Sequence, residues 1–359
     1  MEAEKRREEM TPDFNPQMLT VGRQSRGLTQ AALAKASGIS VPKISKIENG
    51  LILPSEQDRE RFSSALNYPP TFFTQKQEMT AVGQSIYHRM RKIPKKHLDM
   101  IEATLNIRHM HIRKLFLSAE FEERDLPFFE IDELGPPEEI AESLRNYWHV
   151  PRGPVSNLTG LLEGKGAIVI LFDFKTKKID GETITDGRHP PVVFVNSNLP
   201  PDKQRWTLAH ELGHLIMHRI PSQNMEKEAD HFASEFLMPG LEILPMLRGG
   251  VSLQSLYDLK LHWRVPMASV VMRACALGIL TEGQKQYWFR ILNAEGYLKR
   301  EPGEAEVPRE YPEVAKDLVK FHLETLEYSP DQLRDLIGLY EAEFRSTYLS
   351  GGRRLALVS

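Results

Sequence analysis

Apolar residues recur every three or four positions through most of this 359-residue chain, which is the spacing of helices with one buried face. The pattern predicts helices over residues 84–122, 138–148, 157–165, 314–327 and 331–348. Short apolar runs bounded by turn residues predict strands over 167–172, 179–185 and 191–196. We therefore expect a multidomain protein that is mostly α with a small α/β part.

The helical run over residues 206–218 contains the clearest chemical pattern, His-Glu-x-x-His. His210 and His214 are four residues apart and lie on one side of the helix, where both can bind one metal ion. Glu211 lies one residue round from His210 and can reach a water on that metal. Zinc peptidases arrange two ligands and a general base in this way.

A third ligand must come from another element, and a second helix is predicted over residues 225–238, before Pro239 and Gly240. Its apolar residues share one face: Ala229, Phe232, Ala233, Phe236 and Leu237. Glu228 borders this face and can therefore point toward the histidine helix. Asp230 is an alternative, either as a ligand or as an acceptor for a ligand histidine.

Three further polar residues near this pattern are expected to have other roles. Glu226 and Glu235 lie further round the second helix, and we expect both to face solvent. His218 is one turn beyond His214, and three histidines on one helical stripe converge poorly on a metal. We interpret His218 as a structural residue.

The stretch over residues 191–239 resembles the ImmA/IrrE metallopeptidase family, whose pattern is a strand, an HELGH helix and a Glu-Ala helix that ends in Leu-Met-Pro. The resemblance implies that His210, His214 and Glu228 bind one Zn²⁺ per chain and that Glu211 is the catalytic base. It also implies a thermolysin-like zincin core with a short sheet, which hydrolyses peptide bonds. Another divalent transition metal could occupy the same ligands.

Residues 28–50 are typical of two short helices joined by a tight turn. Thr29 can cap the first helix, and Gly38 supplies the turn. The apolar residues that anchor the two helices are Leu33, Ile39, Ile44 and Ile47. The second helix then presents polar side chains outward, as a recognition helix in the major groove does.

This pattern resembles the Cro/repressor-type helix-turn-helix of the xenobiotic-response-element family over residues 14–73. The resemblance implies a double-stranded DNA operator, and the predicted DNA contacts are Gln30, Ser40, Lys43, Ser45 and Lys46. Gln30 could hold a phosphate or brace the recognition helix. Acidic and basic residues nearly balance through residue 75, so a helical hairpin for dimerisation or protein contact stays open as an alternative.

The composition of the chain limits the partners and the cellular compartment that we expect. The formal net charge is −3, so any DNA affinity must come from a local face. The single cysteine, Cys275, excludes an internal disulfide and fits a reducing cytoplasm. The N-terminus lacks the apolar core of a signal peptide, and no uncharged apolar run approaches membrane-spanning length. We expect a cytoplasmic protein with no membrane partner.

The predicted divisions are a disordered tail at 1–12, a helix-turn-helix domain at 13–75, a helical connector and linker at 76–134, a metallopeptidase-like domain at 135–280 and a C-terminal helical region at 281–359. The connector contains a basic cluster from Arg89 to Lys96, which we interpret as a solvated helix face that could also touch DNA phosphates. The C-terminal region shows no recognisable chemistry.

Together these parts predict a DNA-binding transcriptional regulator joined to a zinc metalloendopeptidase, with a homodimer as one compatible assembly. The substrate would be a regulatory protein such as a repressor or antitoxin, cleaved in a stress, phage or mobile-element response. The exposed edge of the Val192–Val195 strand is expected to hold the substrate as an added strand. Two alternatives stay open: a transcription factor whose metallopeptidase-like domain senses a ligand or metal without cleavage, and an antitoxin-type module that regulates its own operon.

Overall fold

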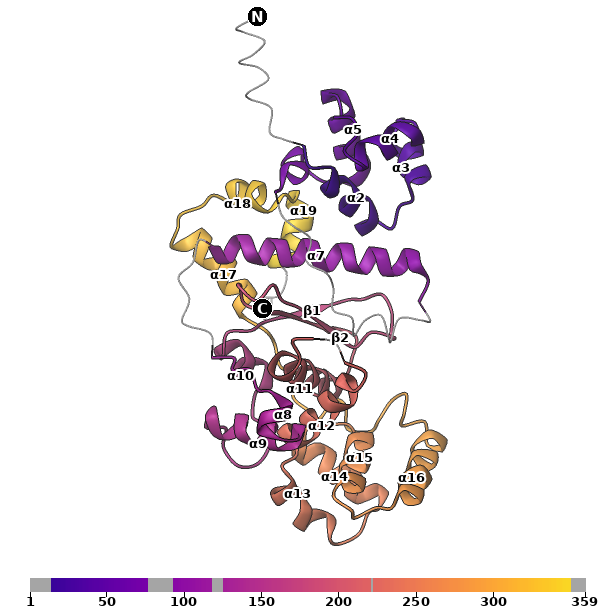
Figure 1. Ribbon diagram of the computed structural model, residues 1–359, viewed down its shortest axis with the longest axis vertical. Helices are drawn as coiled ribbons and strands as arrows, with labels where there is room; N and C mark the ends of the chain where they lie inside the picture. Colours follow the sequence, from indigo (N-terminus) through magenta and orange to yellow (C-terminus); the bar gives the residue numbers. More distant parts are fainter. Residues whose placement is uncertain (1–13, 77–92, 118–124, 221, 350–359) are drawn as a thin grey trace, which may run out of the picture. The chain divides into compact units, whose positions relative to one another are not determined.

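The computed structural model describes residues 14–76, 93–117, 125–220 and 222–349 (Figure 1). These residues form two compact units. The first unit consists of residues 14–76, 93–117 and 314–349, and the second consists of the described residues between 125 and 313. The second unit is therefore inserted, in sequence, between two segments of the first.

This division differs from the predicted boundaries at the C-terminal end. The region expected at 281–359 does not stay together, because residues up to Glu313 belong to the second unit and those from Val314 onward belong to the first. The predicted tail at 1–12 and the basic residues Arg89, Arg91 and Lys92 lie outside the described residues.

The first unit begins with the helix-turn-helix segment. Its elements are α2 (Pro16–Ser25), α3 (Gln30–Ser37), α4 (Val41–Glu48), α5 (Glu56–Leu66) and the 3₁₀ helix η1 (Pro70–Thr74). The Thr29 hydroxyl accepts a hydrogen bond from the Ala32 amide and caps α3, and Gly38 ends α3 in the left-handed region at φ 70°. Both predicted turn signals are confirmed. The predicted anchors are all buried: Leu33, Ile39, Ile44 and Ile47.

The C-terminal helices complete this first unit. The additional elements are α7 (Lys95–Leu117), α17 (Val314–Glu324), α18 (Pro330–Ile337), α19 (Glu341–Phe344) and the π-helical turn η3 (Arg345–Leu349). α7 packs along α2, and α17 and α18 pack against α7 (Figure 1). Lys114 Nζ donates to the Leu336 carbonyl at 2.7 Å, and Ser63 Oγ lies 2.9 Å from the Tyr340 hydroxyl. The C-terminal segment is thus part of the helix-turn-helix unit.

The prediction of one continuous helix in this segment is wrong. The apolar spacing predicted a single helix over 331–348, but Gly338 takes φ 73° and ends α18. A glycine in the left-handed conformation is the common way for a helix to stop. The chain then restarts as α19 after Tyr340.

The second unit contains the remaining helices. They are α8 (Ile131–Leu134), α9 (Pro137–Tyr147), α10 (Leu158–Gly164), α11 (Pro201–Met217), α12 (Met225–Leu237), α13 (Gly240–Leu247), α14 (Leu253–Trp263), α15 (Met267–Ala276) and α16 (Glu282–Ala294). The helices predicted at 138–148 and 157–165 are confirmed by α9 and α10. No described helix combines the length and apolar character that crossing a membrane requires.

The sheet of the second unit has three strands, β1 (Ile168–Phe172), β2 (Gly181–Ile184) and β3 (Val192–Asn196). All three were predicted. Their order is β1-β3-β2, with β1 parallel and β2 antiparallel to β3. The expectation that the Val192–Val195 strand has a free edge is wrong, because β3 is the central strand and is paired on both sides. β2 is an edge strand, and it packs against α11.

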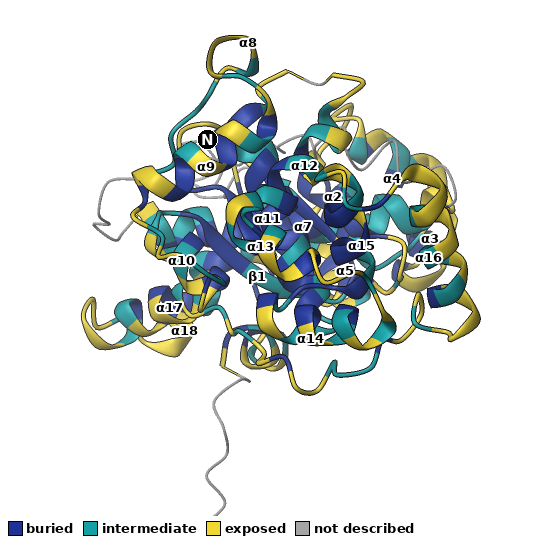
Figure 2. Cartoon of the chain, turned by 90° about the horizontal axis from the view of Figure 1, so that it is seen from below, coloured by how far each residue is buried: buried dark blue, intermediate teal, exposed yellow. Residues whose placement is uncertain are grey.

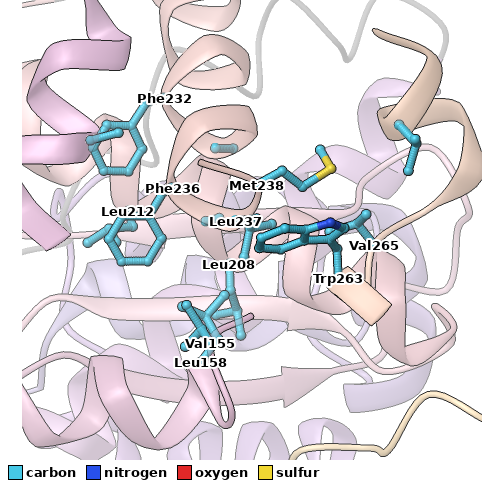
Figure 3. Close-up of a cluster of buried hydrophobic side chains, with 14 of the residues drawn as sticks. Val155, Leu158, Leu208, Leu212, Phe232, Phe236, Leu237, Met238, Trp263 and Val265 are labelled. Atoms are coloured by element: carbon cyan, nitrogen blue, oxygen red, sulfur yellow. The ribbon is translucent and has the colours of Figure 1, made fainter. Parts of the chain in front are cut away.

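The core of the second unit lies around α11, most of whose residues are buried (Figure 2). Leu208 and Leu212 of α11 belong to the same cluster as Phe232 and Phe236 of α12 and Trp263 of α14 (Figure 3). Burying a large apolar side chain contributes about 1.5–3 kcal/mol. This packing fixes the position of the His-Glu-x-x-His helix in the middle of the unit.

Three buried ion pairs around Lys260 and Arg205 also help to fix α11. Lys260 Nζ bonds Asp202, near the start of α11, and lies 2.8 Å from Glu301 Oε2. Arg205 bonds Glu310 and donates to the Val155 carbonyl at 2.7 Å. Because fully buried charges are costly without partners, these pairs tie the segment that contains Glu301 and Glu310 to α11.

Candidate metal site and nucleic-acid interface

The site forms where α11 and α12 pack closely against each other. Gly213 lies at a close contact between the two helices, since an added Cβ would be 3.2 Å from Ala229 Cα and 3.1 Å from the Phe232 ring. The helices run in opposite directions, with His214 beside Glu226 and His210 beside Asp230. The glycine of the HELGH run therefore lets side chains of α12 reach the two histidines.

Three side chains converge at this contact. His210 Nε2 lies 3.1 Å from His214 Nε2, and the Glu226 carboxylate lies 3.6 Å and 3.4 Å from these two nitrogens. One ligand atom from each residue falls within 4.8 Å of the others. Two imidazole nitrogens and a carboxylate are a donor set that suits Zn²⁺ with an open fourth position. The residues present therefore fit a catalytic zinc ion.

The structure brings Glu226, rather than the predicted Glu228, to the two histidines. Glu228 Oε2 instead lies 3.0 Å from His218 Nε2. Glu226 precedes Ala229 by three residues and Asp230 by four, so it lies on the same helical stripe as both. The expectation that Glu226 faces solvent overlooked this spacing, which was a signal available in the sequence.

Each of the two histidines has its Nδ1 atom in a hydrogen bond. His210 Nδ1 lies 2.8 Å from Asp230 Oδ1, and His214 Nδ1 lies 2.9 Å from His218 Nδ1. Burial, followed by the neighbouring His214, lowers the pKa of His218 below its ordinary value. With both Nδ1 atoms engaged, each candidate ligand presents Nε2 to the shared point. Asp230 thus fits the acceptor role that the sequence left open for it.

Glu211 is buried beside the sheet, 3 % exposed. The Thr183 hydroxyl of β2 donates to Glu211 Oε2 at 2.7 Å. Gly181 permits this contact, because an added Cβ would meet the Thr207 methyl group at 2.5 Å. Thr183 could not be predicted from the sequence, because no pattern along the chain states which strand lies over α11. The geometry orients the carboxylate that was predicted to be the base.

A cavity of about 240 Å³ lies one helical turn from the convergent group. Trp206, four residues before His210, lines it from α11, and Asp230 and Ser234 line it from α12. Met272 belongs to the wall formed by α15. A cavity at this place has room for a side chain of a bound polypeptide.

In the first unit, a partly buried cluster braces the candidate recognition helix α4. Glu48, near its end, accepts hydrogen bonds from Arg23 at 2.6 Å and 3.0 Å and from Gln30 at 2.7 Å. A bidentate Arg–carboxylate pair is among the most directional side-chain contacts. Of the two roles considered for Gln30, the structure favours bracing of α4.

The other predicted DNA contacts lie on or beside α4. Ser40 and Lys46 are exposed, and Ser45 is half-buried beside Asn49. Lys43 Nζ lies 2.6 Å from Asp58 Oδ2. Burial alone would raise the pKa of Asp58, but the hydrogen bonds from Lys43 and Ser55 outweigh burial and hold the pKa below its ordinary value. Lys43 is therefore tied to α5, whereas Lys46 faces solvent.

Comparison with known families agrees with both parts of the chain. A helix-turn-helix family model matches residues 22–73, and a peptidase M78 model, described as the IrrE N-terminal-like domain, matches residues 162–274. The first match contains the outward residues Ser40, Ser45 and Lys46, here called the α4 surface, and the second contains the convergent side chains. No curated protein matches the chain. The chain thus joins a helix-turn-helix domain to an IrrE N-terminal-like domain, which confirms the predicted order.

Proposed function

We propose that this chain is a DNA-binding regulator that hydrolyses a peptide bond in another regulatory protein. The observation that supports this most is the convergence of His210 Nε2, His214 Nε2 and the Glu226 carboxylate beside the buried Glu211. A helix-turn-helix domain in the same chain favours a role at specific genes over general protein digestion.

His210, His214 and Glu226 would hold the metal, which we propose to be Zn²⁺. A bound zinc ion would lower the pKa of its water and polarise the substrate carbonyl. Glu211 takes the proton of the attacking water and passes it to the leaving amine. The Thr183 hydroxyl keeps one Glu211 oxygen in place, so the second oxygen is available for that proton.

The substrate would bind in an extended form along β2, the edge strand next to Glu211. An edge strand offers unpaired backbone groups that an added strand can satisfy. Thr183 belongs to this strand and contacts Glu211, so a peptide beside β2 would pass close to the base. The cavity lined by Trp206 would then take a substrate side chain near the cleaved bond.

We propose a repressor or an antitoxin-like protein as the substrate, within a stress, phage or mobile-element response. Such a protein could be a regulator of the genes that the helix-turn-helix domain binds. Cutting it would couple transcription to proteolysis in one chain. The α4 surface, with Lys46 exposed, would position the regulator on its operator.

The proposal is tested by comparing cells that express the wild-type chain with cells that express Glu211→Gln. New protein N-termini are identified by mass spectrometry in both. We expect a new terminus within a regulatory protein in the wild type only. If the wild type generates no terminus that Glu211→Gln lacks, the cleavage proposal is overturned and the non-cleaving alternative is favoured.

A further inference from the structure

We propose that Glu228 acts through His218 to set the proton position on His214, and so makes His214 a zinc ligand. Glu228 and His218 would be positioning residues and would not touch the metal. This inference rests on the proposed metal site. It gives roles to two residues that the convergent group of His210, His214 and Glu226 does not use.

The three side chains form a continuous chain of hydrogen bonds. Glu228 Oε2 lies 3.0 Å from His218 Nε2, and His218 Nδ1 lies 2.9 Å from His214 Nδ1. The His218 side chain is 5 % exposed, so water has little access to compete for these bonds. His214 Nε2, at the other end of the chain, faces His210 Nε2 at 3.1 Å.

The Glu228 carboxylate fixes the donor and the acceptor of every hydrogen bond in this series. An ionised carboxylate only accepts, so His218 must donate through Nε2–H. A neutral imidazole has one N–H, which leaves His218 Nδ1 as an acceptor. His214 must then donate through Nδ1–H, and its Nε2 retains the lone pair that a metal needs. The opposite direction would place a proton on His214 Nε2 and block coordination.

His210 also has its Nδ1 proton fixed by a carboxylate, but through a direct contact. His210 Nδ1 lies 2.8 Å from Asp230 Oδ1, so a carboxylate acts on it directly. At His214, the imidazole of His218, which follows the end of α11, lies between the ligand and Glu228 of α12. Both ligands are therefore backed by a carboxylate, one directly and one through His218.

Zinc affinity is the readout, measured by competition with a chromophoric chelator on the full-length chain. Losing such an outer hydrogen bond typically weakens metal affinity about 10–100-fold. We expect this loss for Glu228→Gln and for His218→Ala. We expect no further loss beyond about twofold when Glu228→Gln is added to His218→Ala, since partners that act in series do not add.

The controls separate this role from the alternatives. Lys227→Gln changes one charge at the adjacent exposed residue and should leave zinc affinity within about twofold of wild type. Melting of the metal-free variants shows whether each still folds. A loss from Glu228→Gln that is as large in the His218→Ala background would overturn the proposal, because Glu228 would then act as a ligand or by charge alone.

The outcomes also separate this inference from the metal site. If wild-type protein binds no zinc, the proposed function fails before Glu228 is considered. If Glu226→Gln abolishes binding while Glu228→Gln has no effect, the metal site stands and the positioning role is refuted. ¹⁵N-histidine spectra of metal-free protein add a second readout: His214 should carry its proton on Nδ1 in wild type and lose that preference in Glu228→Gln.

Discussion

The candidate metal site of the second unit and the α4 surface of the first differ in how their residues are held. His210 and Glu211 are 5 % and 3 % exposed and bonded to Asp230 and Thr183. On α4, by contrast, Lys46 faces solvent, and the restraint lies behind the helix at Glu48. Chemistry needs its groups fixed in relation to each other, whereas DNA contact needs a fixed helix with side chains that adjust.

This difference has consequences for substitution. Changes within the metal site should abolish one step almost completely, because its members act together. Changes on the α4 surface should weaken binding in small increments, because each phosphate contact contributes separately. The following expected outcomes test that contrast.

The largest effect is expected for Glu211→Gln. Removing a general base lowers the rate of the proton-dependent step by about 10²–10⁴-fold. Gln keeps the shape of Glu and its contact with Thr183, so zinc content should stay unchanged. Cleavage of the substrate and zinc content are measured on the same preparation. Equal cleavage by wild type and Glu211→Gln would remove Glu211 from the mechanism.

A smaller effect, on stability, is expected for Gly213→Val. Its side chain would press on Ala229 and Phe232, and overpacking of this kind costs about 1–3 kcal/mol. Denaturant unfolding gives the free energy of unfolding, and zinc affinity should fall because α12 moves away. Gly249→Ala is the matched control, since an added Cβ there meets nothing within 4 Å. Unchanged stability in Gly213→Val would contradict the close approach.

A pH effect is expected in the first unit. Burial, followed by the charges of Arg108 and Lys114, lowers the pKa of His111 well below its ordinary value. His111 is thus neutral when folded and titrates near 6.5 when unfolded. Below pH 6.5 the unfolded chain binds a proton that the folded chain does not. The free energy of unfolding therefore falls by about 1.4 kcal/mol for each unit by which the pH is lowered.

Unfolding at pH 7.5 and pH 5.5 measures this dependence. His111→Asn removes the titrating group and keeps a polar side chain near the Tyr348 hydroxyl, which lies 2.9 Å from His111 Nδ1. The stability of this variant should fall less on acidification than that of wild type. The same fall in both proteins would show that His111 does not contribute.

The smallest effect is expected for Lys46→Ala on the α4 surface. Losing one phosphate contact should reduce the slope of log affinity against log salt by about 0.9. Operator fragments from a binding selection provide the DNA. Lys316→Ala, an exposed lysine on α17, is the control and should leave the slope unchanged. An unchanged slope in Lys46→Ala would favour the dimerisation alternative for this surface.

Contacts within one helix were predictable from the sequence, and contacts between helices were not. His210, Glu211 and His214 follow from spacing along α11, and Thr29 and Gly38 follow from cap and turn chemistry. The spacing of Glu226 from Ala229 and Asp230 was readable in the sequence, but which acid of α12 meets the two histidines depends on how α12 packs on α11 near Gly213.

Two larger features could not be predicted for a related reason. Short apolar runs identify the strands but do not state their order, so the central position of β3 was missed. The apolar faces of α17 and α18 indicate that they bury something, without indicating α7 as the partner. Long-range pairing of this kind is decided by three-dimensional complementarity.

The metal assignment is tested most directly by a crystal structure of the zinc-loaded chain, with anomalous diffraction measured at the zinc edge. We predict one peak per chain, bonded at about 2.0–2.2 Å to His210 Nε2, His214 Nε2 and a Glu226 oxygen. Glu228 should remain on His218. A peak bonded by Glu228 in place of Glu226 would contradict both the ligand set and the positioning role inferred from it.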